Sequence, residues 1–170
     1  MNLFSVDGKI CVVTGAGRGI GYEIASNLAE LGAKVIGVDL SFPEDRYVFS
    51  NQLTLDLTEP NSLVVICNFI QKKYGKLDAL LNCAGITIPQ EGVYSFESWH
   101  KTFAVNIDVP FKLTTSLIPA LEKSSSPSVI NIASLNAHLA FPNNPAYVAS
   151  KTALVGLTRS MVLDLGSKTI

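Results

Sequence analysis

The segment YVASK, residues 147–151, places a tyrosine and a lysine four residues apart at the start of a helical pattern. Residues at this spacing lie on one face of a helix, so we expect the Tyr147 hydroxyl and the Lys151 ammonium to be neighbours. A free tyrosine has a pKa of about 10, too high for an efficient base near neutral pH. A nearby ammonium favours the phenolate, and lowering that pKa by about 3 units requires roughly 4 kcal/mol. The pair is typical of an acid–base site; a half-buried tyrosine beside a solvated lysine is the alternative.

A glycine-rich segment, TGAGRGIG at residues 14–21, lies between an apolar run at 9–13 and a helical pattern at 20–31. Glycines at such a junction permit a sharp turn, a close approach of the backbone to a pyrophosphate, and close packing of the helix on the sheet. Free N–H groups and the dipole at the helix start then favour a diphosphate. The segment predicts a dinucleotide site, and a tight turn without a ligand is the alternative. The three roles fall in order to Gly15, Gly19 and Gly21.

An acidic residue, Asp39, ends the apolar run at 33–39, 18 residues after Gly21. In a dinucleotide fold, a carboxylate at this position accepts hydrogen bonds from the adenine ribose, and its charge repels a 2′-phosphate. Arg18 is a cation in the glycine-rich segment that could hold such a phosphate or could be solvated. Because the charge of Asp39 would lie directly at the ribose, we expect NAD(H) to be favoured over NADP(H).

Apolar runs of strand length alternate along the chain with longer helical patterns. The runs are apolar throughout, which is typical of strands buried on both faces. Strict alternation of strands and helices predicts a parallel, doubly wound sheet with right-handed crossovers. We therefore predict one α/β domain, residues 1–170, with a Rossmann-type sheet in three α/β/α layers. Strands are expected at 9–13, 33–39, 53–57, 76–85 and 128–134, and helices at 20–31, 61–75, 96–121 with an interruption at Pro110, and 146–166.

The composition excludes several classes of partner. The chain has 170 residues, of which 48% are hydrophobic and 16% charged, and a formal net charge of −1, which makes no electrostatic case for nucleic acid or an anionic membrane. Cys11, Cys67 and Cys83 are far apart in apolar runs, so we expect no metal site. No apolar stretch reaches the length of a membrane span, and residues 1–9 lack the pattern of a signal peptide. We expect a cytoplasmic protein.

Five motifs in order resemble those of the short-chain dehydrogenase/reductase family, and the resemblance covers nearly the whole chain. TGAGRGIG is similar to the family's glycine motif, and YVASK matches its Y-x-x-x-K motif. NCAG at residues 82–85 resembles its NNAG motif, with Cys83 in place of the second asparagine. Ser134 stands 13 residues before Tyr147, as the family's active-site serine does. Asn106 lies in AVNIDVP, which resembles the segment that carries the fourth catalytic residue.

The resemblance implies an oxidoreductase that transfers a hydride between NAD(H) and the CH–OH or C=O group of a small alcohol or ketone, a sugar or a 3-oxoacyl substrate. Tyr147 would be the acid–base group, and Ser134 would position the carbonyl. Lys151 would assist Tyr147 and bind the nicotinamide ribose, and Asn106 would hold a water of a proton relay. The cofactor-binding residues that the resemblance implies are Gly15, Arg18, Gly19, Ile20, Gly21, Asp39, Asp56, Leu57, Asn82, Ala84, Gly85, Tyr147 and Lys151.

The chain departs from the family pattern after its last segment, LGSKTI. Family members continue with a sixth strand, a turn over the nicotinamide, a substrate lid and a seventh strand, so the resemblance implies a truncated sheet without the far wall of the substrate pocket. The alternative to an active enzyme is a dinucleotide-binding fragment or regulatory module without turnover. The helices at 96–121 and 146–166 carry wide apolar surfaces, and the family pairs these helices across a two-fold axis. We therefore expect a homodimer or homotetramer.

Overall fold

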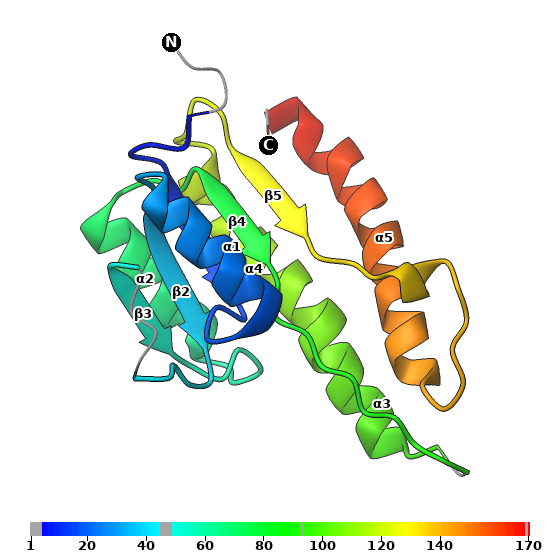
Figure 1. Ribbon diagram of the computed structural model, residues 1–170. Helices are drawn as coiled ribbons and strands as arrows, with labels where there is room; N and C mark the ends of the chain where they lie inside the picture. Colours follow the sequence, from blue (N-terminus) through cyan, green and yellow to red (C-terminus); the bar gives the residue numbers. More distant parts are fainter. Residues whose placement is uncertain (1–4, 45–48, 93, 169) are drawn as a thin grey trace.

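The computed structural model describes residues 5–44, 49–92, 94–168 and 170. Residues 1–4, which belong to the segment where we expect no signal peptide, lie outside these ranges. Five parallel strands form one sheet in the order β3-β2-β1-β4-β5, with helices packed on it (Figure 1). This topology confirms the predicted Rossmann-type α/β fold. The strands are β1 (Ile10–Thr14), β2 (Lys34–Asp39), β3 (Asn51–Thr54), β4 (Ala79–Asn82) and β5 (Ser128–Asn131).

The register of the sheet brings its strand ends to one edge. Thr14, the last residue of β1, pairs with Val38 of β2 and with Asn82, the last residue of β4. Asn82 in turn pairs with Asn131, the last residue of β5. Because all the strands are parallel, the segments that follow them leave the sheet at this carboxyl edge, where ligands of open α/β sheets bind.

Helices cover both faces of the central strands. On one face, Val13 of β1 and Val35 of β2 pack with Ala25 of α1 (Gly19–Glu30). On the other face, Val12 and its neighbours pack with Ile66, which lies in α2 (Ser62–Lys73), and with apolar residues of α4 (Val109–Leu121). Successive side chains of β1 therefore enter opposite layers, as the pleat of a strand requires.

The remaining helices lie toward the β5 side of the sheet (Figure 1). They are α3 (Phe96–Phe103), α5 (Pro145–Leu165), the π-helical turn η1 (Ala104–Asp108) and the short 3-10 turns η2 (Leu135–Ala137) and η3 (Gly166–Lys168). α5 packs against α3, η1 and η2. Among the described residues, no helix is both long and apolar enough to cross a membrane.

The single helix expected at 96–121 is divided by η1. In a regular α-helix, the ring of Pro110 would clash with the carbonyl group four residues earlier, and the wider π-turn avoids that contact. The predicted interruption is therefore confirmed, but it lies in the turn before the proline. As a result, Asn106 stands inside the π-turn.

The third strand lies earlier in the chain than predicted. β3 covers Asn51–Thr54 rather than 53–57, so that prediction is wrong by two residues at the start of the strand and three at its end. Leu55 still donates a backbone hydrogen bond to the end of β2, but the chain then turns. The turn forms because the carboxylate of Asp56 accepts the backbone N–H of Thr58 at 2.8 Å.

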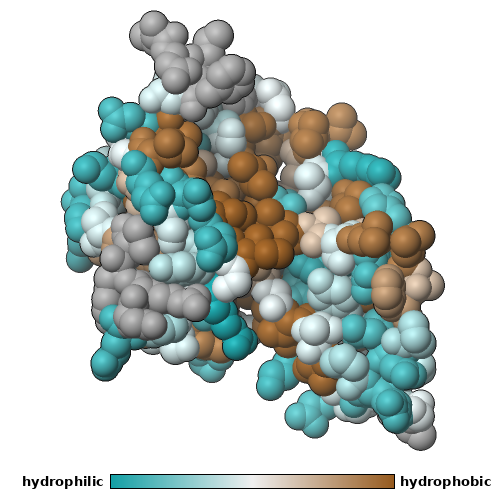
Figure 2. Space-filling model, viewed as in Figure 1, coloured by the Kyte–Doolittle hydropathy of each residue, from teal (hydrophilic) through white to brown (hydrophobic). Residues whose placement is uncertain are grey.

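β5 differs from the other strands in its burial. Its side chains alternate between exposed and half-buried, so the prediction of burial on both faces is wrong for this strand. Ile130 pairs with Leu81, whose side chain packs in the α1 layer, and yet 45% of the Ile130 surface is exposed. Figure 2 shows hydrophobic side chains gathered in a hollow between the region of α1 and that of α5. The reason is that α1 packs on β1 and β2, while α5 packs on α3 and η1.

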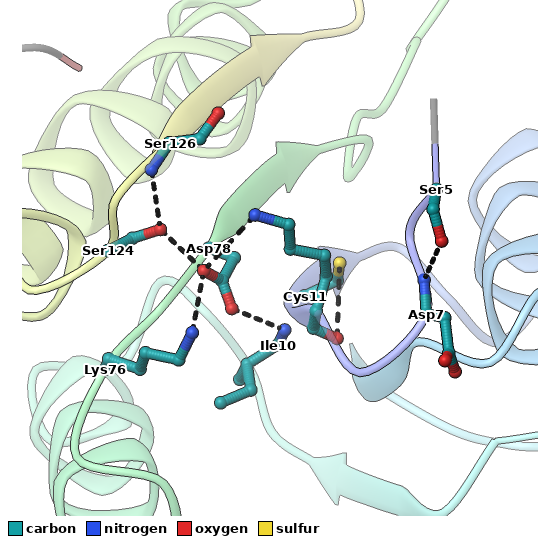
Figure 3. A network of polar contacts seen from close by, with 9 residues as sticks. Ser5, Asp7, Ile10, Cys11, Lys76, Asp78, Ser124 and Ser126 are labelled. Atoms are coloured by element: carbon teal, nitrogen blue, oxygen red, sulfur yellow. Dashed lines mark hydrogen bonds and ion pairs between the residues drawn. The ribbon is translucent and has the colours of Figure 1, made fainter. Parts of the chain in front are cut away.

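A buried carboxylate joins three segments at the opposite, amino edge of the sheet (Figure 3). Asp78 is 2% exposed, and its Oδ2 accepts the backbone N–H of Ile10 at 2.9 Å. Its Oδ1 accepts hydrogen bonds from the Lys76 ammonium at 3.0 Å and from the Ser124 hydroxyl. Burial alone would raise the pKa of Asp78, but these hydrogen bonds outweigh it and hold the pKa below its usual value. The network lies away from the predicted site and stabilises the fold.

Candidate active site

A cavity of about 470 Å³ lies along the carboxyl edge of the sheet. It is bounded by the end of β2, the turn after β3, the glycine-rich loop, the segments after β4 and β5, and the first turns of α5. Its size is in the range of cofactor sites. Its lining includes twelve of the thirteen residues predicted to bind a cofactor: Gly15, Arg18, Gly19, Ile20, Gly21, Asp39, Asp56, Leu57, Ala84, Gly85, Tyr147 and Lys151.

The glycine-rich loop is shaped by two close backbone approaches. Gly15 has φ +68°, and a Cβ built on it would lie 2.9 Å from the backbone N and Cα of Ala84. A Cβ on Gly21 would clash with the carbonyl oxygen of Gly15, so only glycine lets α1 start so close to the strand. The first turn of α1 holds no acidic side chain, and its N-cap, Arg18, makes no side-chain cap bond. The N–H groups at this helix start can therefore serve an anion.

A hydroxyl that the sequence analysis did not single out joins the glycine-rich loop to the segment after β4. Thr14 is 1% exposed, and its Oγ1 accepts the backbone N–H groups of Cys83 at 3.1 Å and Ala84 at 3.0 Å. This contact holds the NCAG segment beside the loop. The available signal was a polar residue at the end of an otherwise apolar strand.

Asp39 is fixed at the β2 end of the cavity. Its Oδ2 accepts the backbone N–H of Gly17 at 2.8 Å, and its Oδ1 accepts that of Leu40 at 2.6 Å. A Cβ on Gly17 would press on this carboxylate and clash with the carbonyl of Ser41. The negative charge therefore stands beside the glycine-rich loop in a defined orientation. Arg18 also lines the cavity, but its side chain is exposed.

Asp56 and Leu57 line the cavity in the turn after β3. Asp56 accepts the Thr58 hydroxyl at 2.6 Å as well as the Thr58 N–H, and these two hydrogen bonds lower the pKa of the Asp56 carboxyl. The carboxylate is therefore ionised at neutral pH and held within its own turn. Leu57 and the neighbouring Leu55 give this end of the cavity an apolar wall.

Tyr147 and Lys151 line the other end of the cavity, from the first two turns of α5. Lys151 is 4% exposed; its Nζ donates a 2.8 Å hydrogen bond to the carbonyl of Ile132 and lies 5.8 Å from the centroid of the Tyr147 ring. Burial lowers the pKa of the Lys151 ammonium. Within the described part of the chain no carboxylate pairs with it. A buried lysine without a counter-ion at a cavity wall is typical of a functional site.

Asn106 is fully buried behind this wall. Its Oδ1 accepts the N–H of Ile86 at 2.9 Å, and its Nδ2 donates to the carbonyl of Ile86 and to the Ser150 hydroxyl, both at 3.0 Å. A Cβ on Gly85 would lie 3.3 Å from Lys151 Nζ and 3.5 Å from Asn106 Oδ1, so these groups are close together. The side chain of Asn106 does not line the cavity; it fixes the backbone of the β4 segment that does.

Ser134 and Asn82 also lie off the cavity wall. Ser134 is the N-cap of η2, and its Oγ accepts the N–H of Asn136 at 3.1 Å, which leaves its O–H free to donate. Asn82 donates a 2.8 Å hydrogen bond to Oδ1 of Asn131 and a longer one to the Thr114 hydroxyl. Asn82 therefore joins β4 to β5 and α4, a role that its place in the NCAG segment did not predict.

The cavity wall includes residues that the sequence analysis did not assign to the cofactor: Leu40, Leu55, Thr58, Cys83, Ile86, Thr87, Val105, Ile132 and Ala133. All of them stand within three residues of a strand end or of a predicted site residue, which was the only signal available. Burial raises the pKa of the Cys83 thiol to about 11, so it is a neutral, largely apolar group where the family motif has an amide.

The structure is a Rossmann-type α/β domain with a cavity at the carboxyl edge of its sheet and a tyrosine–lysine pair at the cavity wall. A family model described as short chain dehydrogenase matches residues 9–170. The chain is 36% identical over 159 residues to 2,3-dihydro-2,3-dihydroxybenzoate dehydrogenase of Escherichia coli K12, a match that covers 93% of this chain and 64% of that protein. It is 33% identical over 171 residues to the 3-oxoacyl-acyl-carrier-protein reductase FabG of the same organism, covering 96% and 70%. The chain belongs to the short-chain dehydrogenase family.

Solved structures show the same relationship. The ligand-free aldohexose dehydrogenase of Thermoplasma acidophilum superposes with a TM-score of 0.88 at 33% sequence identity, and the match covers 94% of this chain and 62% of that one. The chain thus spans about two thirds of the length of these relatives. The structural likeness extends over nearly all of this chain.

Proposed function

We propose that the chain binds a nicotinamide dinucleotide along the carboxyl-edge cavity and interconverts an alcohol and a carbonyl compound. The observation that carries this proposal is Lys151, a buried ammonium at the cavity wall beside Tyr147, with no carboxylate partner among the described residues. Structural lysines are rarely buried without a counter-charge, since desolvation disfavours the charged form. The ribose hydroxyls of a bound cofactor and the reacting oxygen of a substrate would be the hydrogen-bond and charge partners of this ammonium.

The residues present fit the dinucleotide. The glycine-rich loop packs tightly at Gly15 and Gly21, where a Cβ would meet protein backbone. A Cβ on Gly19, which has φ +57°, would meet nothing within 4 Å, so open space for a pyrophosphate remains beside the N–H groups of α1. Asp39 stands at one end of the cavity and Lys151 at the other. By the order of the strands, the adenosine half belongs at the β2–β3 end and the nicotinamide half at the β4–β5 end.

In this arrangement the bound cofactor supplies or accepts a hydride, and the protein moves the accompanying proton. We assign proton transfer at the substrate oxygen to the Tyr147 hydroxyl. Lys151 faces the Tyr147 ring and keeps two N–H donors beyond its bond to Ile132, enough for a ribose hydroxyl. The free O–H of Ser134 is assigned to the substrate oxygen, where it would orient a carbonyl and stabilise developing charge.

Asn106 is assigned to the same site as a residue of the proton path, but its contacts support a more specific role. Its amide already holds both backbone groups of Ile86 and the Ser150 hydroxyl. We infer that Asn106 shapes the wall next to Lys151. A water of the proton relay would then be held by other groups, such as backbone carbonyls of this segment.

We further propose that NAD(H) is favoured over NADP(H). The carboxylate of Asp39 is oriented by Gly17 and Leu40 at the cavity end assigned to the adenine ribose. It can accept hydrogen bonds from ribose hydroxyls, and its charge opposes a 2′-phosphate. Arg18 is exposed and free to turn toward either cofactor's diphosphate, so it does not offset Asp39.

The substrate class proposed is a secondary alcohol or its ketone, carried by a small alcohol, a sugar or a 3-oxoacyl compound. The names of the relatives include a dihydrodiol dehydrogenase, a hydroxysteroid dehydrogenase, a 3-oxoacyl reductase and an aldohexose dehydrogenase. Each of these classes of compound contains at least one CH–OH or C=O group. That group would lie beside Tyr147.

We also propose a homodimer or homotetramer through α4 and α5. Most apolar side chains of α4 are buried against the sheet and are therefore not available for a subunit interface. Phe111 of α4 remains 48% exposed, and Val162 and Leu163 of α5 are 61% and 83% exposed. Light scattering of the purified chain tests this proposal, and a monomer would count against it.

The first test of the proposed function is a titration of the purified chain with NADH and, in parallel, with NADPH, read by cofactor fluorescence. Tighter binding of NADH is expected. Lys151→Met should weaken NADH binding, whereas Lys112→Met, at an exposed site on α4, should not. Turnover is then sought with a panel of alcohols and ketones. Binding without turnover of any member would identify a dinucleotide-binding module, and absence of binding would refute the proposal.

A further inference from the structure

Two loops at the β4–β5 end of the cavity are joined by polar contacts that the proposed chemistry does not use. One loop, residues 85–92, follows β4, and the other, residues 139–144, precedes α5. The backbone N–H of Gln90 donates to the carbonyl of Asn143 at 2.8 Å. The side-chain Nδ2 of Asn144 donates to the Thr87 hydroxyl at 2.6 Å.

The side chain of Asn144 does not cap its own helix. Asn144 is the N-cap of α5, where asparagine commonly bonds to the backbone N–H groups of its own helix, yet it makes no such bond. The preceding residue, Asn143, has φ +59°, in the left-handed region that asparagine tolerates better than most residues. The backbone before α5 thus turns the Asn144 amide across to the other loop, toward Thr87.

Each end of this hydrogen bond adjoins a group of the candidate site. Thr87 lines the cavity, two residues after Gly85, whose surroundings include Lys151 Nζ. Asn144 lies off the wall, and Tyr147 follows it by three residues in the first turn of α5. The contact therefore connects the cavity wall formed by the β4 segment with the helical turn that carries Tyr147.

We propose that Asn144 is a positioning residue that, through Thr87, holds the first turn of α5 in register with the β4 wall for the nicotinamide half of the cofactor. This inference rests on the proposed function. The adenosine half binds at the other end of the sheet edge, so the Asn144–Thr87 contact acts on only one half of the ligand. It also fixes the orientation of Tyr147 toward that half.

The test compares two ligands that differ in the nicotinamide half. NADH and ADP share the adenosine diphosphate, and only NADH carries the nicotinamide and its ribose. Both are titrated calorimetrically into the purified chain and into Asn144→Ala, Thr87→Val and the double variant. Each single variant should weaken NADH binding about fivefold, the effect of one lost hydrogen bond, and should leave ADP binding unchanged within about twofold.

A double-mutant cycle and a conservative variant separate positioning from other roles. If the two residues act through their shared bond, the double variant should bind NADH about as weakly as either single variant. Thr87→Ser keeps the hydroxyl and should restore the binding of NADH. Additive losses, equal losses for both ligands, or no loss in Asn144→Ala would each overturn the inference. Thermal melts confirm that every variant is folded.

The two proposals fail in different ways. If the unaltered chain binds neither ADP nor NADH, the proposed function fails, and the positioning role fails with it. If the unaltered chain binds both ligands but the ratio of their affinities is the same in Asn144→Ala and Thr87→Val, the proposed function stands and only the positioning role is refuted.

Discussion

The ammonium of Lys151 is held between two groups, the Ile132 carbonyl at 2.8 Å and the Tyr147 ring, whose centroid lies 5.8 Å away. The carbonyl belongs to the segment just after β5, so the lysine is anchored by the sheet and not only by its own helix. Tyr147 and Lys151 thus face the cavity with one donor of the lysine already engaged and two left over. This arrangement assigns different tasks to the two residues, and substitutions can separate them.

Tyr147→Phe should impair proton transfer strongly and weaken cofactor binding only slightly. We expect turnover to fall about 100-fold or more, the usual contribution of a positioned acid–base group, and NADH affinity to change by less than about threefold. Lys151→Met should lower both, because it removes a donor at the cavity wall as well as the charge beside Tyr147. Assays that follow NADH absorbance measure turnover, and fluorescence titrations measure NADH affinity. Tyr94→Phe, at an exposed tyrosine, is the control, and an equal loss there would contradict the assignment.

Asp39→Asn should weaken the preference for NADH over NADPH without disrupting the glycine-rich loop. The Asn oxygen can still accept the N–H of Gly17, while the N–H of Leu40 loses its acceptor, so the change removes the charge and keeps the contact to the glycine-rich loop. We expect NADPH affinity to rise about tenfold at low salt, because repulsion of a 2′-phosphate is lost, and NADH affinity to fall slightly. Titrations at two salt concentrations measure this. An unchanged preference would show that Asp39 does not face the ribose, and Arg18→Ala then tests the other charge in the loop.

The sequence was informative where function depends on local spacing. The glycine-rich loop and the Tyr147–Lys151 pair each lie within one turn or one junction, and the motif residues predict their placement on the cavity wall. The parallel, doubly wound sheet followed from the alternation of strands and helices. Contacts between distant segments had no such signal. The Thr14 hydroxyl beneath the NCAG segment joins residues about 70 positions apart, and no local pattern indicates such a pairing.

The role of Asn82 and the exposure of β5 could not be predicted from the sequence, for physical reasons. Asn82 stands in a cofactor motif but lies 2% exposed among the strands, because the amide satisfies polar groups between β4 and β5. An apolar run such as that of β5 indicates that both faces of the strand favour burial. It does not indicate whether helices cover both faces. Ile130 is consequently exposed where the prediction expected a core residue.

Asn106→Ala should destabilise the fold as well as the site. The amide makes three hydrogen bonds at a fully buried position, two of them to the backbone of Ile86, which would be left unsatisfied. We expect the free energy of unfolding to fall by about 2–4 kcal/mol, measured by urea denaturation. Ser150→Ala, which removes one of those bonds, should cost about 1 kcal/mol. If Asn106→Ala left stability unchanged and only lowered turnover, a pure relay role would be favoured over the wall-shaping role.

Asp78→Asn should destabilise the protein in a pH-dependent way. Hydrogen bonds from Ser124, Ile10 and Lys76 hold the pKa of Asp78 below the usual 3.8, against the effect of burial. A carboxyl whose pKa is lower in the folded than in the unfolded state adds stability that is fully present above the unfolded value and is lost as the pH falls through the folded value. At pH 7 we expect Asp78→Asn to lower the free energy of unfolding by about 2 kcal/mol.

The difference between Asp78→Asn and the unaltered protein should begin to shrink as the pH falls below about 4 and should continue to shrink through the folded-state pKa of Asp78, where protonation removes the charge that asparagine lacks. Urea denaturation at pH 7 and at pH 3 measures it. Asp108→Asn is the matched control, because Asp108 is exposed and lies 3.9 Å from Lys112 in an ordinary surface pair. That change should cost less than about 0.5 kcal/mol at either pH. An effect of Asp78→Asn that is the same at both pH values would mean that the network depends on shape and hydrogen bonding alone, and not on the charge of the carboxylate.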